Sequence, residues 1–366
     1  ALAQASKGLA VRFTFTEDQL LFQTSVRNLL TKECTPQHIR KSWETETGRS
    51  PEMWSKLGEI GLLGLLVPEA HGGLGMDEVD LILPLEETGR AALPEPVVET
   101  AAVGVPLLAS GVSKEIQELE KRWLPEVASG KAILTVGHGV NPCVCDAHVA
   151  DLLLLQHGED ELHAVPRERA GLEQQPCSDA SRRLFRIEWK PGPDTRVAKG
   201  TEGRRLLDQM LDRASLACAA QQLGIAQQLV DMAVQYGTER HQFGKPIGSF
   251  QAIKHMLANV QVRIEFARPV VYRAAFSVAH GSETQSLTVS HAKAAASEAA
   301  VRAAKAALQV HGAVGYTWEV DLQIWMKRAW ALEAAWGNRI WHHARIGETI
   351  LDGTGAAPTF GYSAPV

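Results

Sequence analysis

The sequence lacks the features that would place the protein in a membrane or on nucleic acid. Its "LLLLQ" run at residues 152–156 is far shorter than the roughly 20 apolar residues that cross a bilayer. A net charge of −5 over 366 residues gives no general electrostatic case for binding nucleic acid. The first residues, "ALAQASKGLAVRFTF", lack the unbroken apolar core of a secretory signal. We therefore expect a soluble protein with neither a membrane nor a nucleic-acid partner.

Cysteine is also scarce, and its pattern does not build a metal site. The five cysteines are an odd number, and no spacing among them closes a zinc site. Cys143 and Cys145 form a lone Cys-x-Cys pair, which fits ordinary free thiols better than redox or metal chemistry. This usage predicts a cytoplasmic location and no bound metal.

What the sequence does contain is three blocks of different texture. Residues 1–12 read as a flexible tail, and residues 13–120 as an N-terminal α-helical domain that opens with the capping box "TEDQ" at Thr16–Gln19. Residues 121–200 hold short apolar runs such as "AILTVGHGV" between Gly, Pro, Asp and Asn, which is typical of strands and turns. From residue 201 to 366, helical spacing returns with many Ala residues and predicts a helical bundle.

A short stretch between two of the helical patterns carries an unusual set of side chains. "ERHQFGKPIGSFQAIKH", residues 239–255, places an arginine, a phenylalanine and two glutamines around a turn. Together with "VPEAHGGLG" at 67–75 and "QVHGAVGYTWE" at 309–319, it resembles the acyl-CoA dehydrogenase family over nearly the whole chain. The motifs occur in the family's order, so together they are far more specific than any one alone.

The resemblance implies a mainly α fold with an N-terminal helical domain, a shortened middle β domain and a C-terminal four-helix bundle. It also implies FAD, an acyl-CoA substrate that gains an α,β double bond, and tetramers built as a dimer of dimers. In such proteins the two glycine- and arginine-bearing motifs reach the FAD of the neighbouring subunit. The matching positions here are Arg240, Phe243, Gln251, Gln309, Gly312 and Gly315. The alternative is that Arg240 only caps a helix and Gln309 only lies on a bundle surface.

The residues that would do the chemistry depart from the family pattern. The catalytic glutamate is expected near residue 336 or 214, and the sequence has Trp336 and Ala214 there, with Ser215 where the family has an arginine. A strand resembling "TEPxAGSD", which holds the flavin ring in the family, is replaced by "TVGHGVNPCVCDAHVADLL". The second glycine of the Gln-x-x-Gly loop is Ala313. Neither tryptophan nor alanine can accept the α-proton.

These departures predict a non-catalytic subunit that completes the FAD site of a second acyl-CoA dehydrogenase-like chain. By family analogy, we expect an α2β2 heterotetramer with half the usual flavins, acting on a bulky acyl-CoA such as a steroid-derived one. An electron-transfer flavoprotein or a similar acceptor would take the electrons. The alternative is a self-sufficient homotetramer that uses Glu333, one helical turn from Trp336, or an unrecognised base.

Overall fold

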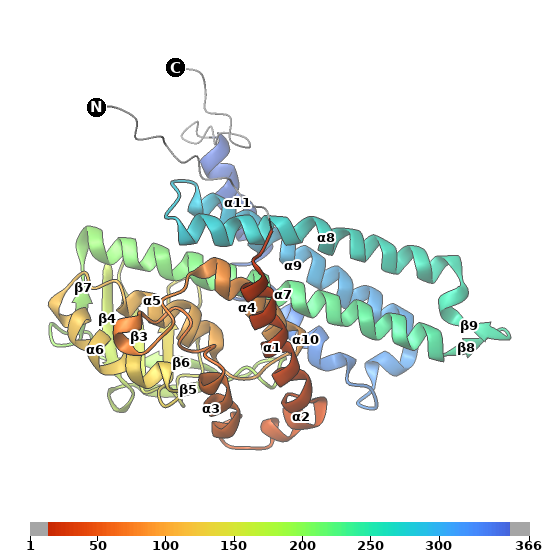
Figure 1. Ribbon diagram of the computed structural model, residues 1–366, viewed down its shortest axis with the longest axis horizontal. Helices are drawn as coiled ribbons and strands as arrows, with labels where there is room; N and C mark the ends of the chain where they lie inside the picture. Colours follow the sequence, from red (N-terminus) through yellow and green to blue (C-terminus); the bar gives the residue numbers. More distant parts are fainter. Residues whose placement is uncertain (1–13, 352–366) are drawn as a thin grey trace.

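The computed structural model describes residues 14–351, so the tail predicted for residues 1–12 lies outside the described part. The chain begins with six α-helices (Figure 1). They are α1 (Glu17–Glu33), α2 (Pro36–Trp43), α3 (Pro51–Glu59), α4 (Glu78–Arg90), α5 (Val105–Leu108) and α6 (Lys114–Ala128). The predicted boundary at residue 120 falls inside α6, which continues because Leu124 and Val127 are buried in the main core.

The middle of the chain forms two small sheets. Their strands are β1 (Leu134–Gly137), β2 (Val144–Cys145), β3 (Leu152–His157), β4 (Glu161–Pro166), β5 (Gly171–Gln175), β6 (Leu184–Glu188) and β7 (Arg196–Ala198). One sheet has the order β1-β3-β4-β7 and the other β2-β6-β5. β1 pairs parallel with β3, while the other strand pairs are antiparallel. The chain therefore passes from one sheet to the other in the loop between β1 and β2.

Long helices complete the fold. They are α7 (Gly200–Glu239), α8 (Gln251–Ala279), α9 (Gln285–His311), α10 (Leu322–Ala334) and α11 (Arg339–Leu351), with the hairpin of β8 (His241–Gln242) and β9 (Lys245–Pro246) between α7 and α8. Figure 1 shows α7, α8 and α9 side by side, and the hairpin at one end of this bundle. The mainly α fold class with a small β region is thus confirmed. None of the helices within residues 14–351 is long and apolar enough to span a membrane.

Local sequence signals explain where helices begin, whereas close approach explains how they cross. The predicted capping box is confirmed: Gln19 N donates to Thr16 Oγ1 at 3.2 Å, and Thr16 N donates to Gln19 Oε1 at 2.8 Å.

α4 crosses α7 where two glycines meet the opposite backbone. A Cβ on Gly89 would overlap Gln221 O, and one on Gly224 would overlap Glu86 O. These glycines let the N-terminal helices pack directly on the bundle.

Gly224→Ala should therefore destabilise the protein by about 1–3 kcal/mol, because the added methyl group forces α4 away from α7. A fall in the urea midpoint, followed by far-UV circular dichroism, would measure this. Gly347→Ala is the matched control: it also lies within a helix, but a Cβ there meets nothing within 4 Å. The control should be neutral or stabilising by up to about 1 kcal/mol. Equal midpoints for both variants would contradict the close-crossing argument.

Candidate functional site

The two positions at which the sequence predicts the family's glutamate lie near each other in the fold. Ala214 is fully buried on α7, and Trp336 is 1% exposed in the segment between α10 and α11. Ser215, next to Ala214, donates from Oγ to Trp336 O at 3.2 Å. Both positions therefore lie in the same part of the core, and neither residue carries a carboxylate.

A buried lysine holds the segment that carries Trp336. Lys293, on α9, is 0% exposed, and its Nζ donates to Leu332 O at 2.9 Å, Glu333 O at 3.2 Å and Gly337 O at 3.2 Å. Burial lowers the pKa of Lys293 to about 8. The lysine thus satisfies carbonyls at the end of α10 that have no partner within the helix.

Sequence reasoning missed Lys293, although a signal for it exists. The residue lies on a face of α9 whose neighbours at helical spacing, Val289 and Ala296, are both fully buried. A lysine on such a face needs several hydrogen-bond acceptors. The sequence shows the buried face but does not show which carbonyls accept the hydrogen bonds.

Trp336 itself adopts an uncommon backbone conformation with φ of +57°. Its carbonyl lies 3.0 Å from Nε2 of His342, and burial lowers the pKa of His342 to about 3, so the neutral ring donates from Nε2. Its amide donates to Asn141 Oδ1 at 2.7 Å, and the His138 ring lies 6.2 Å from the indole. The loop between β1 and β2 therefore rests directly on Trp336.

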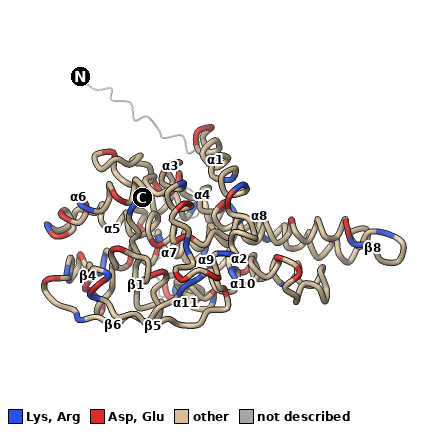
Figure 2. The backbone as a smooth tube through the Cα atoms, turned by 90° about the horizontal axis from the view of Figure 1, so that it is seen from below, with Lys and Arg blue, Asp and Glu red and all other residues tan. Residues whose placement is uncertain are grey.

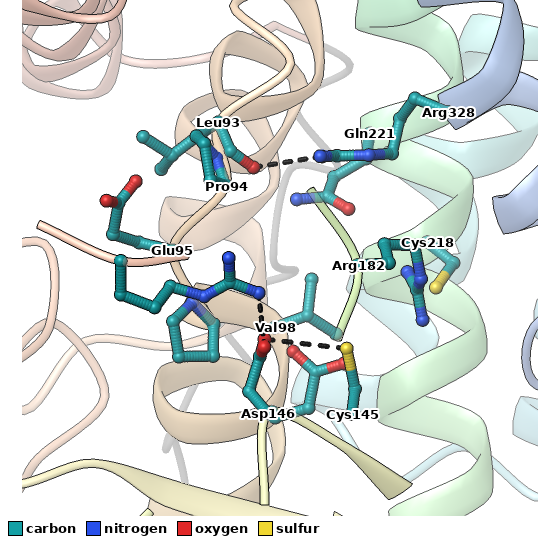
Figure 3. Close-up of a pocket in the computed structure, with 13 residues that line it drawn as sticks. Leu93, Pro94, Glu95, Val98, Cys145, Asp146, Arg182, Cys218, Gln221 and Arg328 are labelled. Atoms are coloured by element: carbon teal, nitrogen blue, oxygen red, sulfur yellow. Dashed lines mark hydrogen bonds and ion pairs between the residues drawn. The ribbon is translucent and has the colours of Figure 1, made fainter. Parts of the chain in front are cut away.

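Beside this contact, the junction of the three parts of the chain is filled by charged groups (Figure 3). Arg49 pairs with Asp146, and Arg328 pairs with Asp179 and donates to Leu93 O at 2.9 Å. The remaining cavity is only about 20 Å³, against roughly 300–1,000 Å³ for a ligand pocket. A charged cavity of that size does not fit an acyl chain.

Three side chains at this junction could in principle ligate a metal ion. Glu99, Cys145 and Asp146 place one ligand atom each within 4.8 Å of one another. Arg49 already pairs with Asp146. Burial raises the pKa of Cys145 well above its ordinary value. The contacts are those of an ionic core.

The residues predicted to reach a neighbouring FAD gather at the opposite end of the bundle. Arg240, Gln251, Gln309 and Gly312 are exposed or partly exposed, and Phe243 is 89% exposed at the tip of the β8–β9 hairpin. Figure 2 shows this end of α8 projecting away from the rest of the molecule. The structure thus brings the two separate motifs to one surface.

The glycines of this surface differ in what they do. Gly312 has a φ of +64°, and a Cβ there would meet nothing within 4 Å, so its backbone is open to a ligand. Gly315 is buried, and a Cβ there would lie 2.9 Å from Leu308 Cδ1, so it serves packing. Ala313 does not have a positive φ, so the backbone of the loop accepts its methyl group without strain.

Glu333, the alternative candidate for the catalytic base, accepts a hydrogen bond from another part of the chain. Its Oε1 accepts a hydrogen bond from Arg339 N at 3.3 Å, at the first residue of α11. It does not line the charged cavity of the junction. In this arrangement the carboxylate helps to position α11.

The burial of Lys293 should appear as a pH dependence of stability. The pKa of Lys293 in the folded chain is about 8, below the ordinary 10.5, so between these pH values the unfolded chain binds one more proton than the folded chain. The free energy of unfolding therefore increases by up to about 3 kcal/mol as pH rises through that window. Lys293→Met removes this gain and leaves carbonyls unpaired, at a cost of about 1–3 kcal/mol. Urea midpoints of both proteins from pH 7.5 to 10 should diverge with pH; a constant difference would contradict a depressed pKa.

Comparisons with known proteins match both terminal parts of the chain. Residues 16–131 match the acyl-CoA dehydrogenase N-terminal domain, and residues 201–351 match the C-terminal domain. Acyl-CoA dehydrogenase IpdE2 of Mycolicibacterium smegmatis is 35% identical over 86% of this chain and 93% of its own. IpdE2 of Mycobacterium tuberculosis is 32% identical over 86% of this chain and 91% of its own.

Solved structures extend the likeness to the whole fold. The ChsE4-ChsE5 complex from Mycobacterium tuberculosis contains a chain with a TM-score of 0.83 at 26% identity, covering 95% of this chain and 100% of that one. A chain from a variant of the Tcur3481-Tcur3483 steroid ACAD has a TM-score of 0.82 at 25% identity, covering 92% and 99%. With both of its terminal domains matched and a relative at 35% identity, the chain belongs to the acyl-CoA dehydrogenase family of FAD-dependent oxidoreductases.

Proposed function

We propose that this chain is the non-catalytic partner subunit of a heteromeric acyl-CoA dehydrogenase, in which it completes the FAD site of a second, catalytic chain. The observation that carries the proposal is the hydrogen bond of 2.7 Å from Trp336 N to Asn141 Oδ1, beneath an indole that is 1% exposed. Asn141 lies in the loop where the family's flavin-ring strand is expected. That loop packs on Trp336 itself, which supports a flavin-ring position that the chain's own residues fill.

The groups around Trp336 cannot carry out the proton transfer. Forming an α,β double bond in an acyl-CoA needs a carboxylate to take the α-proton, while the bound FAD accepts a hydride. Among the described residues, those that hydrogen-bond to the Trp336 backbone are Ser215, Asn141 and His342. None is a carboxylate, and burial keeps His342 neutral and poorly basic.

The other end of the bundle has the chemistry to hold part of an FAD that belongs to a partner. The guanidinium of Arg240 can bind phosphate oxygens through paired, charge-assisted hydrogen bonds. Phe243 offers an exposed ring face. The backbone at Gly312 is open to a ligand, although its own N–H donates to Leu308 O. These groups point out of the chain, so they can serve only a cofactor that another subunit brings.

Two of the similar structures are described as pairs of different proteins, ChsE4 with ChsE5 and Tcur3481 with Tcur3483, the latter called a steroid ACAD. This supports an α2β2 assembly with the FAD shared between unlike chains, and a bulky, steroid-derived acyl-CoA as the substrate of the complex. An electron-transfer flavoprotein or a similar acceptor would reoxidise the FAD of the complex. The self-sufficient alternative needs Glu333 as the base and is less well supported, because Glu333 accepts a hydrogen bond from Arg339 N instead.

Flavin content tests the proposal directly. Expressed alone, the chain should bind essentially no FAD, because its own ring site is filled. Co-expressed with the acyl-CoA dehydrogenase homologues of its source genome, it should purify with one of them at about one FAD per pair, measured by absorbance after denaturation. A yellow protein formed by this chain alone, with one FAD per chain and bleaching on addition of an acyl-CoA, would overturn the proposal.

Single substitutions separate the two candidate roles. In the complex, Arg240→Ala should weaken FAD binding by about tenfold to a hundredfold, since a hydrogen bond to a charged group contributes about 1.5–3 kcal/mol. Arg240→Lys should restore part of it. Glu333→Gln should leave the rate of acyl-CoA oxidation unchanged. A large loss of turnover in Glu333→Gln, with normal assembly and FAD content, would favour the self-sufficient alternative.

A further inference from the structure

The two motifs proposed to reach a partner's FAD lie at the ends of two helices, and a pair of stacked rings joins these ends. Tyr236 lies about one helical turn before Arg240, the residue that ends α7. His311 is the last residue of α9 and directly precedes Gly312. The two ring centroids are 4.3 Å apart, and the ring planes differ by 21°. The stack therefore connects the helix end that carries Arg240 with the helix end that carries Gly312.

The imidazole of His311 is held in one orientation. The residue is 8% exposed, and its Nδ1 lies 2.8 Å from Ala307 O. Because a carbonyl oxygen can only accept, Nδ1 is the donor of this hydrogen bond. Burial lowers the pKa of His311, although the hydrogen bond opposes this shift, so the ring is neutral near pH 7. The imidazole thus presents a fixed, uncharged face to the ring of Tyr236.

Backbone contacts connect Tyr236 to the arginine and to the hairpin. Arg240 N donates to Tyr236 O at 2.9 Å, and Ile247 N donates to Arg240 O at 2.8 Å. Gly237, the next residue along α7, lies close to the segment that follows the hairpin: a Cβ on Gly248 would be 2.9 Å from Gly237 O. Both ends of the hairpin are therefore packed on the last turn of α7, which is the turn that Tyr236 anchors.

The hairpin is too short to fix its own position. Its strands β8 and β9 have two residues each, and an isolated two-stranded hairpin is at best marginally stable in water (Figure 1). Phe243, at its tip, is 89% exposed and has a φ of +51°, a conformation that is unfavourable for a residue other than glycine. The directions in which Arg240 and Phe243 point consequently depend on the contacts at the base of the hairpin.

We infer that Tyr236 is a positioning residue for the partner's FAD. Its stack on His311 sets the distance between the arginine motif and the glycine motif, and it acts through Arg240 rather than on the cofactor. This inference rests on the proposed function and adds the residue that keeps the two halves of one cofactor site in register. A ligand that binds both motifs gains affinity when they are already in place, because ordering them during binding costs free energy.

The first test measures FAD affinity in the complex of the full chain with the homologue that it pairs with. Tyr236→Ala should raise the dissociation constant of FAD about threefold to tenfold, the range expected for the loss of one aromatic pair. Tyr236→Phe keeps the ring and should bind FAD like the unmutated complex. Titration of FAD into the deflavinated complex gives these constants. Unchanged affinity in Tyr236→Ala would overturn the inference.

A matched control removes a stack of the same kind elsewhere. Phe276 and His280 stack with ring centroids 3.9 Å apart and planes that differ by 20°. Phe276 lies near the last residue of α8, whereas the hairpin precedes the first residue of that helix. Phe276→Ala should therefore leave the FAD dissociation constant unchanged. A loss of affinity equal to that of Tyr236→Ala would mean that any lost stack weakens FAD binding, which contradicts a specific role for Tyr236.

A double-mutant cycle separates positioning from a merely structural role. If Tyr236 acts through Arg240, Tyr236→Ala should change the FAD dissociation constant by less than about twofold once Arg240 is already alanine, because residues that act together are not additive. An equal effect of Tyr236→Ala in both backgrounds would show that the ring acts independently of Arg240, and the inference would fail.

Hydrogen exchange of the chain expressed alone tests the structural step without any cofactor. Tyr236→Ala should speed exchange of the Ile247 amide, which donates to Arg240 O, while amides in the middle of α9 stay protected. Unchanged exchange at Ile247 would overturn the inference. The proposed function is judged separately, by FAD per pair in the unmutated complex, which depends on no variant of Tyr236.

Discussion

Hydrogen bonds to the buried backbone of Trp336 join the β region to the helical bundle. The amide and carbonyl of Trp336 lie buried between two helices, where water cannot satisfy them, so each needs a partner from elsewhere in the chain. Asn141 of the β1–β2 loop takes the amide, while Ser215 of α7 and His342 of α11 take the carbonyl. The β region is thereby held against the bundle.

Buried ion pairs at the charged junction hold the three regions of the chain in a fixed arrangement. Buried ion pairs add little net stability, but breaking one is costly because it leaves a buried charge without its partner. Arg49 joins the N-terminal region to Asp146 of the β region, and Arg328 joins α10 to Asp179. Burial also raises the pKa of Glu95 and Glu99, which reduces repulsion among the acidic groups. The three regions are thus fixed in one arrangement around a cavity of about 20 Å³.

The molecule consequently has one closed end and one open end. At the closed end, ion pairs and hydrogen bonds join side chains from the three regions. At the open end, Phe243 and Arg240 of the hairpin region are exposed to solvent. A surface of exposed aromatic, cationic and glycine backbone groups is suited to a cofactor and a chain supplied from outside. This division underlies the proposed partner role.

The sequence by itself determined the features that depend on neighbouring residues. The capping box at Thr16, the turn before Gly244, the helical spacing of the bundle and the family motifs are all local patterns, so they could be predicted without coordinates. Trp336 and Ala214, at the two positions where the family pattern predicts a glutamate, were visible in the same way. What only the tertiary structure decided is how those positions meet. Asn141 and Trp336 are 195 residues apart in sequence, and no local signal fixes which buried polar groups pair across such a separation.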